Sequence, residues 1–154
     1  MGYTGIYNLD ACGKDYIIRN NVFLEQRRHA VLARAPNGLI ENNLIDGVGG
    51  SAISLGNAIG SFYEGPFPRN TVIRGNTIRN VMSIPIVIQA QGSRKMRHIR
   101  NIQLIGNDVE TKQNIALRAL GAEGLLLQNN RFVGPPGLSE SDLIQLTNST
   151  LASD

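Results

Sequence analysis

The stretch Ile40-Glu41-Asn42-Asn43-Leu44-Ile45 holds an asparagine between two aliphatic side chains, one three residues before it and one two residues after it. The same frame surrounds five asparagines along the chain: Asn21, Asn43, Asn76, Asn107 and Asn130. The residue before each of them is Asn or Gly, the types that tolerate a left-handed backbone. The intervals are 22, 33, 31 and 23 residues, so two repeats are one unit long and two carry an insertion.

A short apolar segment follows each of these asparagines. The segments are Ala30–Ala33, Ala52–Leu55, Pro85–Ile88, Asn114–Leu117 and Leu143–Leu146, with Asn8–Ala11 one period before the first. Alternating apolar residues inside a repeat of about 22 residues indicate strands that stack on one another. We therefore predict an all-β fold, a right-handed single-stranded parallel β-helix (solenoid) of about five to six coils of about 22 residues.

Alternation across a strand assigns the side chains to faces of the coil. We expect three inward rows: Ile18, Ile40, Ile73, Leu104 and Leu127; Phe23, Ile45, Ile78, Val109 and Phe132; and Leu9, Val31, Ile53, Ile86, Ile115 and Ile144. The five asparagines are expected to form an internal ladder in which each amide donates to the next side-chain carbonyl. Strict alternation turns Ile17, Leu39, Val72 and Leu126 outward, so either something covers that strand or the alternation slips at the turn.

Composition limits the class of protein. The chain has 154 residues, 42% hydrophobic residues, one cysteine and a net charge of +3, which suits one β-helix domain over residues 1–154. Because no capping helix is recognisable, we expect a fragment of a longer β-helix or an end-to-end homo-oligomer.

The sequence contains no motif for several kinds of partner. No apolar run is long enough for a membrane helix, no nucleic-acid-binding module is present, and His29 and His98 lack metal-ligand spacing. We expect no cofactor, no metal, no nucleic acid and no membrane as partners.

Two insertions, residues 57–69 and 91–100, interrupt the period on the same edge of successive coils. Loops on a rigid scaffold commonly carry binding and catalysis, so we expect them to wall a groove. Its floor would hold outward-facing Arg34, Ser54, Gln89 and Arg118, and Tyr63 would add an aromatic surface. Such a groove suits an oligosaccharide or polysaccharide.

Glycoside hydrolysis requires two carboxylates. Glu64 is the candidate acid or base because it is the one carboxylate inside either insertion, and Asp10 would lie on the same outward row as Ser54. The alternative for Glu64 is an ion pair with Arg69 or Arg94. Glu123 shares the pre-strand position of Arg69 and Arg100, so we expect it to pair with them.

The runs Arg28–Asn43, Gly49–Asn57 and Glu64–Asn70 resemble the parallel β-helix repeats of carbohydrate-active enzymes, most closely glycoside hydrolase family 110. The resemblance covers most of residues 8–133 and implies an exo-acting, inverting α-1,3-galactosidase, with an extracellular or periplasmic location favoured for the parent protein. The row of Asp10 continues with Leu32 and Ser54 rather than acids, so no complete catalytic set carries over. The alternative is a non-catalytic glycan-binding or stalk module of a larger surface or spike protein.

Overall fold

The computed structural model describes residues 6–57, 65–89 and 98–152. Within these residues the chain contains strands and no helix, arranged as three five-stranded sheets. Sheet A contains β1 (Ile17–Arg19), β4 (Leu39–Glu41), β7 (Arg69–Arg74), β10 (Ile99–Ile105) and β13 (Ala122–Gln128). Sheet B contains β2 (Val22–Leu24), β5 (Leu44–Val48), β8 (Thr77–Val81), β11 (Asp108–Thr111) and β14 (Arg131–Val133). Sheet C contains β3 (Val31–Ala33), β6 (Ile53–Gly56), β9 (Ile86–Gln89), β12 (Leu117–Leu120) and β15 (Ile144–Thr147).

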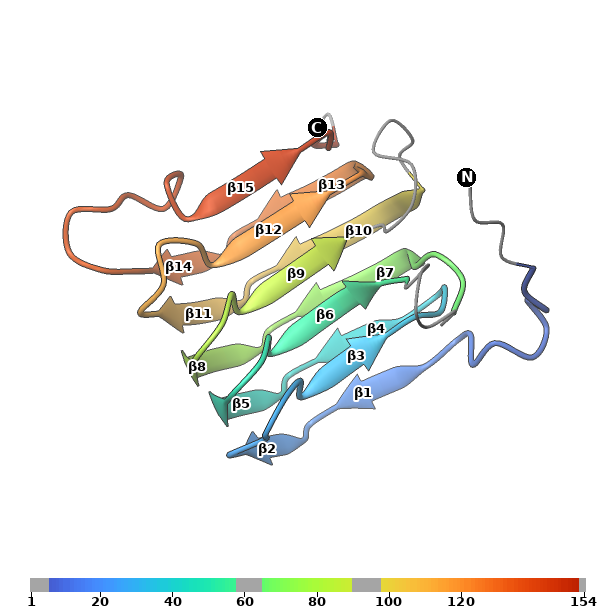
Figure 1. Ribbon diagram of the computed structural model, residues 1–154, viewed down its shortest axis with the longest axis horizontal. Coiled ribbons are helices and arrows are strands. Elements are labelled where there is room, and N and C mark those ends of the chain that lie inside the picture. Colours follow the sequence, from blue (N-terminus) through green and yellow to red (C-terminus); the bar gives the residue numbers. More distant parts are fainter. Residues whose placement is uncertain (1–5, 58–64, 90–97, 153–154) are drawn as a thin grey trace, which may run out of the picture.

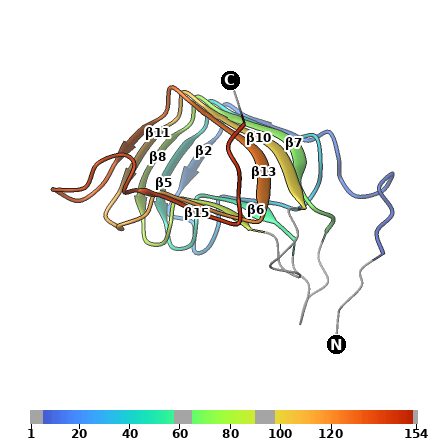
Figure 2. The same ribbon diagram turned by 90° about the horizontal axis from the view of Figure 1, so that it is seen from above.

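Each coil contributes one strand to each sheet, and every neighbouring pair within a sheet is parallel. In Figure 1 the coils rise from the N-terminal one, running rightward along sheet C in front and leftward along sheet A behind. This sense is right-handed. Seen along the stack, the three sheets enclose the core (Figure 2). The prediction of a parallel β-helix is confirmed.

The first two predicted inward rows are in register. In sheet A, Ile18 pairs with Ile40, and the row continues through Ile73 and Leu104 to Leu127. The row from Phe23 to Phe132 does the same in sheet B. The middle members of both rows are completely buried, so each coil covers the core of its neighbour.

The third row was predicted wrongly at two places. Leu117, not Ile115, pairs with Ile86 and with Ile144. The chain from Asn107 to Leu117 has the same length as from Asn76 to Ile86, so the two coils close alike. Leu9 is not in sheet C, because it lies in a turn and is 56% exposed.

The asparagine ladder is present at the corner between sheets A and B. The Nδ2 atoms of Asn43, Asn76 and Asn107 donate to the Oδ1 atom of the next ladder residue at 2.9, 2.9 and 2.8 Å. Each Nδ2 also donates to a main-chain carbonyl of the coil before, as Asn76 does to Ile40 at 3.0 Å. Each Oδ1 also accepts the backbone N–H of the previous ladder residue. The buried amides are therefore fully paired, as burial requires.

A second, exposed ladder lies where the chain enters sheet A. Asn37, Asn70 and Asn101 donate in turn to Asp15, Asn37 and Asn70 at 2.8, 3.1 and 3.0 Å. All four residues have positive φ, which Asn and Asp tolerate. Gly124 follows at the same turn with φ +66°. This ladder was not predicted from the sequence, although its spacings of 22, 33 and 31 residues repeat those of the inner one.

The outward residues of sheet A obey alternation. Ile17 is 62% exposed, and Leu39, Val72 and Leu126 are half-buried, so the alternation does not slip at the turn. In the next outward row, Arg19, Glu41 and Arg74 are in register, and Arg74 Nε lies 2.6 Å from Glu41 Oε1. Such exposed pairs contribute at most about 1 kcal/mol.

The two ladders give a direct test of what holds the stack. We expect Asn76→Ala to lower the free energy of unfolding by about 3 kcal/mol or more, because it leaves buried groups of Asn43 and Ile40 unpaired. The matched control is Asn101→Gly, which keeps the positive φ and should cost less than about 1 kcal/mol at an exposed site. Urea unfolding followed by circular dichroism measures both. Equal losses would show that the buried ladder has no special weight.

Candidate functional site

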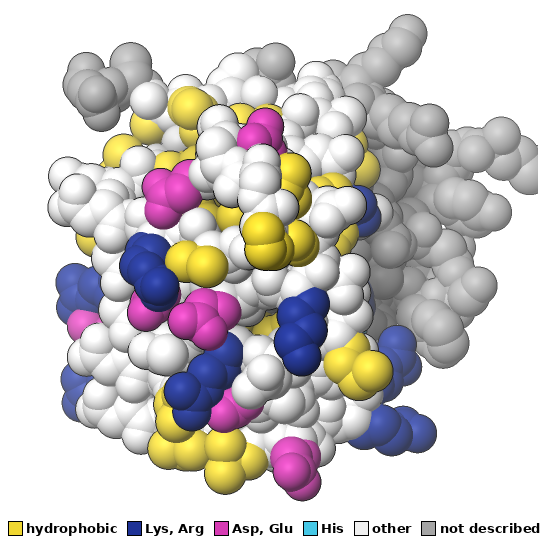
Figure 3. All heavy atoms as spheres, turned by 90° about the vertical axis from the view of Figure 1, so that its left-hand side faces the viewer, with side chains coloured by type: hydrophobic (Ala, Val, Ile, Leu, Met, Phe, Trp, Pro, Cys, Tyr) yellow, Lys and Arg dark blue, Asp and Glu magenta, His cyan; other side chains and the backbone are white. Residues whose placement is uncertain are grey.

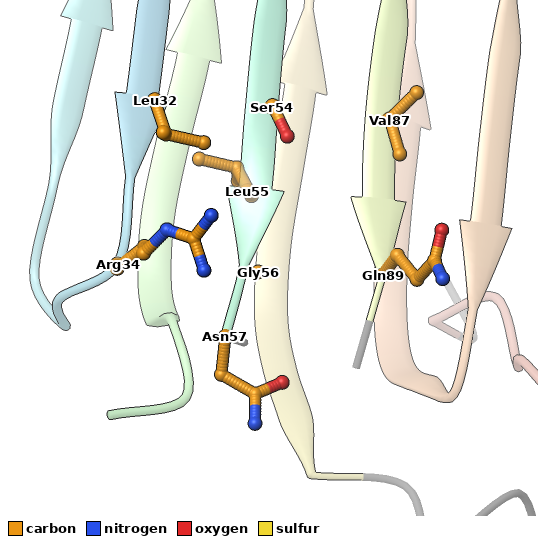
Figure 4. Close-up of a pocket in the computed structure, with 8 residues that line it drawn as sticks. All are labelled: Leu32, Arg34, Ser54, Leu55, Gly56, Asn57, Val87 and Gln89. Atoms are coloured by element: carbon orange, nitrogen blue, oxygen red, sulfur yellow. The ribbon is translucent and has the colours of Figure 1, made fainter. Parts of the chain in front are cut away.

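A small hollow of about 80 Å³ lies on the outward face of sheet C, at the carboxyl ends of β3, β6 and β9. It is lined by Leu32, Arg34, Ser54, Leu55, Gly56, Asn57, Val87 and Gln89, and we call it the sheet C pocket (Figure 4). Three predicted sugar-binding residues, Arg34, Ser54 and Gln89, are therefore brought together.

The strand register explains why these side chains meet. Ser54 pairs with Leu32 on one side and Val87 on the other, which gives one outward row. Gly56 pairs with Gln89 in the next outward row, and Arg34 follows β3 at the matching place. Figure 4 shows the Arg34 guanidinium pointing toward Gly56, while the Gln89 amide lies beyond Gly56 and turns away from Arg34.

Two glycines shape the pocket. A Cβ on Gly56 would lie 2.4 Å from the carbonyl oxygen of Gln89, so only glycine permits this approach and the space between Arg34 and Gln89 stays open. A Cβ on Gly65 would lie 2.4 Å from the Cβ and from the carbonyl oxygen of Arg34, and Gly65 has φ +65°. The chain that returns to sheet A therefore packs directly against Arg34.

The chemistry of the lining suits a hydroxyl-rich ligand. A guanidinium, a hydroxyl and two carboxamides supply both donors and acceptors, and Leu32 and Val87 supply apolar contact. No carboxylate lines the pocket among the described residues. This part of the chain therefore offers groups for binding, whereas acid–base catalysis would require carboxylates from elsewhere.

The other predicted site residues lie in different places. Arg118 was expected on the groove floor, where a strand with Ile115 inward would place it beside Gln89. It is instead in register with Val87, and its Nε donates to Gln145 at 2.7 Å. Because Leu117 occupies the inward position expected of Ile115, Arg118 lies two residues further back along its strand and does not line the pocket. Tyr63 and Glu64 lie outside the described residues.

Asp10 does not reach sheet C. It lies in a turn before β1, and its carboxylate pairs with Lys14 Nζ at 3.0 Å while its side chain is 92% exposed. The predicted outward row of Asp10 with Ser54 is therefore wrong. The expected pairing of Glu123 is confirmed for Arg100, whose Nε lies 3.0 Å from Glu123 Oε2.

An aromatic pair formed by one residue of each insertion was not predicted. Phe67 and His98 stack with ring centroids 4.3 Å apart and planes 19° apart. Phe67 lies two residues before Arg69 and His98 lies two residues before Arg100, and the two arginines are paired in sheet A. The pairing of these arginines was therefore the signal that could have predicted the contact of the two rings.

The surroundings of His98 lower the pKa of its imidazole below the ordinary 6.5. Burial is the largest cause, and the positive charges of Arg69 and Arg100 add to it. On another face, the pKa of Asp46 is lowered mainly by hydrogen bonds from Asn80 and Arg79.

The sheet B face carries interspersed charges of both signs (Figure 3). Arg79 pairs with Asp46 at 2.9 Å, and Arg131 pairs with Asp108. Neither pair lies near the sheet C pocket. In the part of the chain that the structure describes, no cluster of His, Cys, Asp and Glu could hold a metal ion. No helix among the same residues is long and apolar enough to cross a membrane.

No protein-family model matches the chain. It is similar to the alpha-1,3-galactosidase B of Akkermansia muciniphila, with 31% identity over 130 residues. The match covers 76% of this chain and 16% of that protein. The chain thus spans a small part of the length of the protein it matches. The similarity supports a carbohydrate-processing class of protein.

The lowered pKa of His98 predicts a pH effect on stability. As the pH falls, the unfolded chain binds a proton at His98 near the ordinary pKa of 6.5, whereas the folded chain binds it only at a lower pH. The folded state therefore loses stability as the pH falls through this range. We expect the unfolding temperature to fall more in the wild type than in His98→Gln between about pH 7.5 and about pH 5.5. All other ionisable groups are common to both proteins. Equal falls would contradict the prediction.

Proposed function

We propose that this chain is a carbohydrate-processing β-helix segment that binds a sugar in the sheet C pocket. The observation that carries the proposal is that Arg34, Ser54, Asn57 and Gln89 line one hollow. The similarity to an alpha-1,3-galactosidase supports galactose as the first sugar to test. Arg34 is the strongest binding group in the proposal, because a charged donor makes stronger hydrogen bonds than a neutral one.

The preferred form of the proposal is a glycoside hydrolase related in activity to exo-α-galactosidases. Glu64 is then the acid or base, and the second carboxylate comes from outside the described residues. Asp10 has no part in this proposal, because it lies in an exposed turn before β1 and does not line the pocket. Tyr63 is proposed to contact the sugar from the first insertion.

The second candidate is a non-catalytic glycan-binding or stalk module. The observation that favours it is the lack of a carboxylate in the pocket lining among the described residues. A glycan-binding module would share the sugar site with the hydrolase and differ from it in hydrolysis. We also propose that the coils belong to a longer stack, and this is supported by the parallel bridge between Leu125 and Leu151.

A paired arginine experiment tests the sugar site. Calorimetry with free galactose is expected to show saturable binding that Arg34→Ala weakens by about 10- to 100-fold, the value of one hydrogen bond to a charged group. The matched control is Arg118→Ala, which removes the same charge from the same sheet outside the pocket and should leave binding unchanged. Absence of galactose binding, or equal weakening by both variants, would refute the site.

Hydrolysis is tested separately with an α-1,3-linked galactose disaccharide. Release of galactose that falls about 10²-fold or more in Glu64→Gln supports the hydrolase, since that is the usual contribution of an acid–base group. Binding of the disaccharide without any release supports the non-catalytic module instead.

A further inference from the structure

A larger hollow lies around the corner from the sheet C pocket, where the chain passes from sheet C to sheet A. It measures about 550 Å³ against about 80 Å³ for the pocket. Ligand sites commonly measure about 300–1,000 Å³, so the pocket alone holds only part of a sugar ring. The larger hollow, which we call the corner groove, has room for a sugar of its own.

The lining of the corner groove is mostly apolar with a few polar groups. Tyr7 and Phe67 supply its aromatic surface, and Asn37, Asn70, Lys14 and Arg69 supply polar side chains. A flat apolar surface with amide and cationic donors at its margin suits a pyranose ring, whose faces carry C–H groups and whose edge carries hydroxyls.

The Phe67 ring is held in place before any ligand arrives. His98 stacks on it at 4.3 Å, and Phe67 also packs against the core. A fixed aromatic ring loses little conformational freedom on binding, which favours affinity.

The amides at the margin are also fixed. Asn70 Nδ2 donates to Asn37 Oδ1 at 3.1 Å, and Asn101 Nδ2 donates to Asn70 Oδ1 at 3.0 Å. Both Asn37 and Asn70 have positive φ, 60° and 49°. The exposed ladder thus doubles as one wall of the groove.

Most charges around the corner groove are paired with an opposite charge, which favours a neutral ligand over a polyanion. Lys14 pairs with Asp10, and Arg100 pairs with Glu123, both at 3.0 Å. Arg69 lines the groove, and no carboxylate among the described residues forms a salt bridge with it. Asp15, hydrogen-bonded to Asn37 at 2.8 Å, supplies the opposite charge nearby.

The corner groove and the sheet C pocket lie on either side of one contact. Arg34 lines the pocket, and the neighbouring Pro36 lines the groove. Gly65 packs so closely on Arg34 that a Cβ added to Gly65 would lie 2.4 Å from the Arg34 Cβ. Pro66 and Phe67, which follow Gly65, line the groove. A ligand that spans both hollows crosses this contact.

We propose that the corner groove is a second sugar subsite, which takes the neutral sugar that follows the one in the sheet C pocket. The ligand is then an oligosaccharide of two or more sugars, with its second ring packed on Phe67. This inference rests on the proposed function.

Calorimetry with galactose and with an α-1,3-linked galactose disaccharide, using Glu64→Gln as background if the disaccharide is cleaved, tests the subsite. We expect the disaccharide to bind about tenfold or more tightly than galactose, because the second ring buries further apolar surface. Phe67→Leu keeps apolar volume but removes the flat face, so it should abolish that gain and leave galactose affinity unchanged. Phe67→Tyr should retain the gain, and Asn70→Gly, which keeps the positive φ, should reduce it.

The outcomes separate this inference from the proposed function. Equal affinity for the two sugars, or a gain that survives in Phe67→Leu, overturns the subsite while the pocket stands. Absence of galactose binding overturns both. A negatively charged sugar that binds more tightly than the neutral disaccharide overturns the neutral ligand class.

Discussion

The buried asparagine ladder fixes how one coil sits on the next, and every other feature depends on that register. Its amides bind the side chain above, the carbonyl of the coil below and a backbone N–H. A shift of one coil by one residue would leave these groups unpaired inside the core, where an unpaired polar group costs about 1–3 kcal/mol. The corner between sheets A and B therefore keeps one conformation through all five coils.

A fixed corner on one side leaves the opposite corner free to vary. Two of the intervals between successive ladder asparagines are longer, 33 and 31 residues. The number of residues from each ladder asparagine to the sheet C strand that follows it is the same from β3 to β12. The extra residues therefore lie between sheet C and sheet A. The core rows continue past the insertions without a gap. The outward side chains beside the insertions, such as Ser54 and Gln89, take no part in these core rows.

Sequence alone was sufficient for the parts of the fold that carry a repeated residue type. The five asparagines and the two inward rows beside them were predicted residue by residue and are in register. The row in sheet C slipped at Ile115 and Leu117, because a slip of two residues keeps the same face of the strand and alternation cannot detect it. That slip misplaced Arg118. Asp10 failed for another reason: Asn8–Ala11 has the apolar pattern of a strand, yet the chain turns there.

Two features were missed, the exposed ladder and the aromatic pair. The exposed ladder has three asparagines at intervals of the inner ladder, yet it begins with Asp15 and ends at Gly124, so it does not repeat one residue type throughout. The stack of Phe67 on His98 joins two different rings. Both lie where positive φ or strand register, rather than hydrophobic pattern, sets the position.

A double-cysteine experiment tests the register that places the site most directly. Val87 and Arg118 are parallel partners, so their Cα atoms lie about 4.8 Å apart across neighbouring strands. This distance is within the usual Cα range of a disulfide, about 4.4–6.8 Å. Both cysteine pairs are made in a Cys12→Ser background, which removes the native thiol. Val87→Cys with Arg118→Cys should therefore form a disulfide under mild oxidation, detected by peptide mass spectrometry, whereas Val87→Cys with Ala116→Cys should not. Efficient bonding of the second pair in the folded protein, with none in the first, would contradict the stacked register and the position of the site built on it.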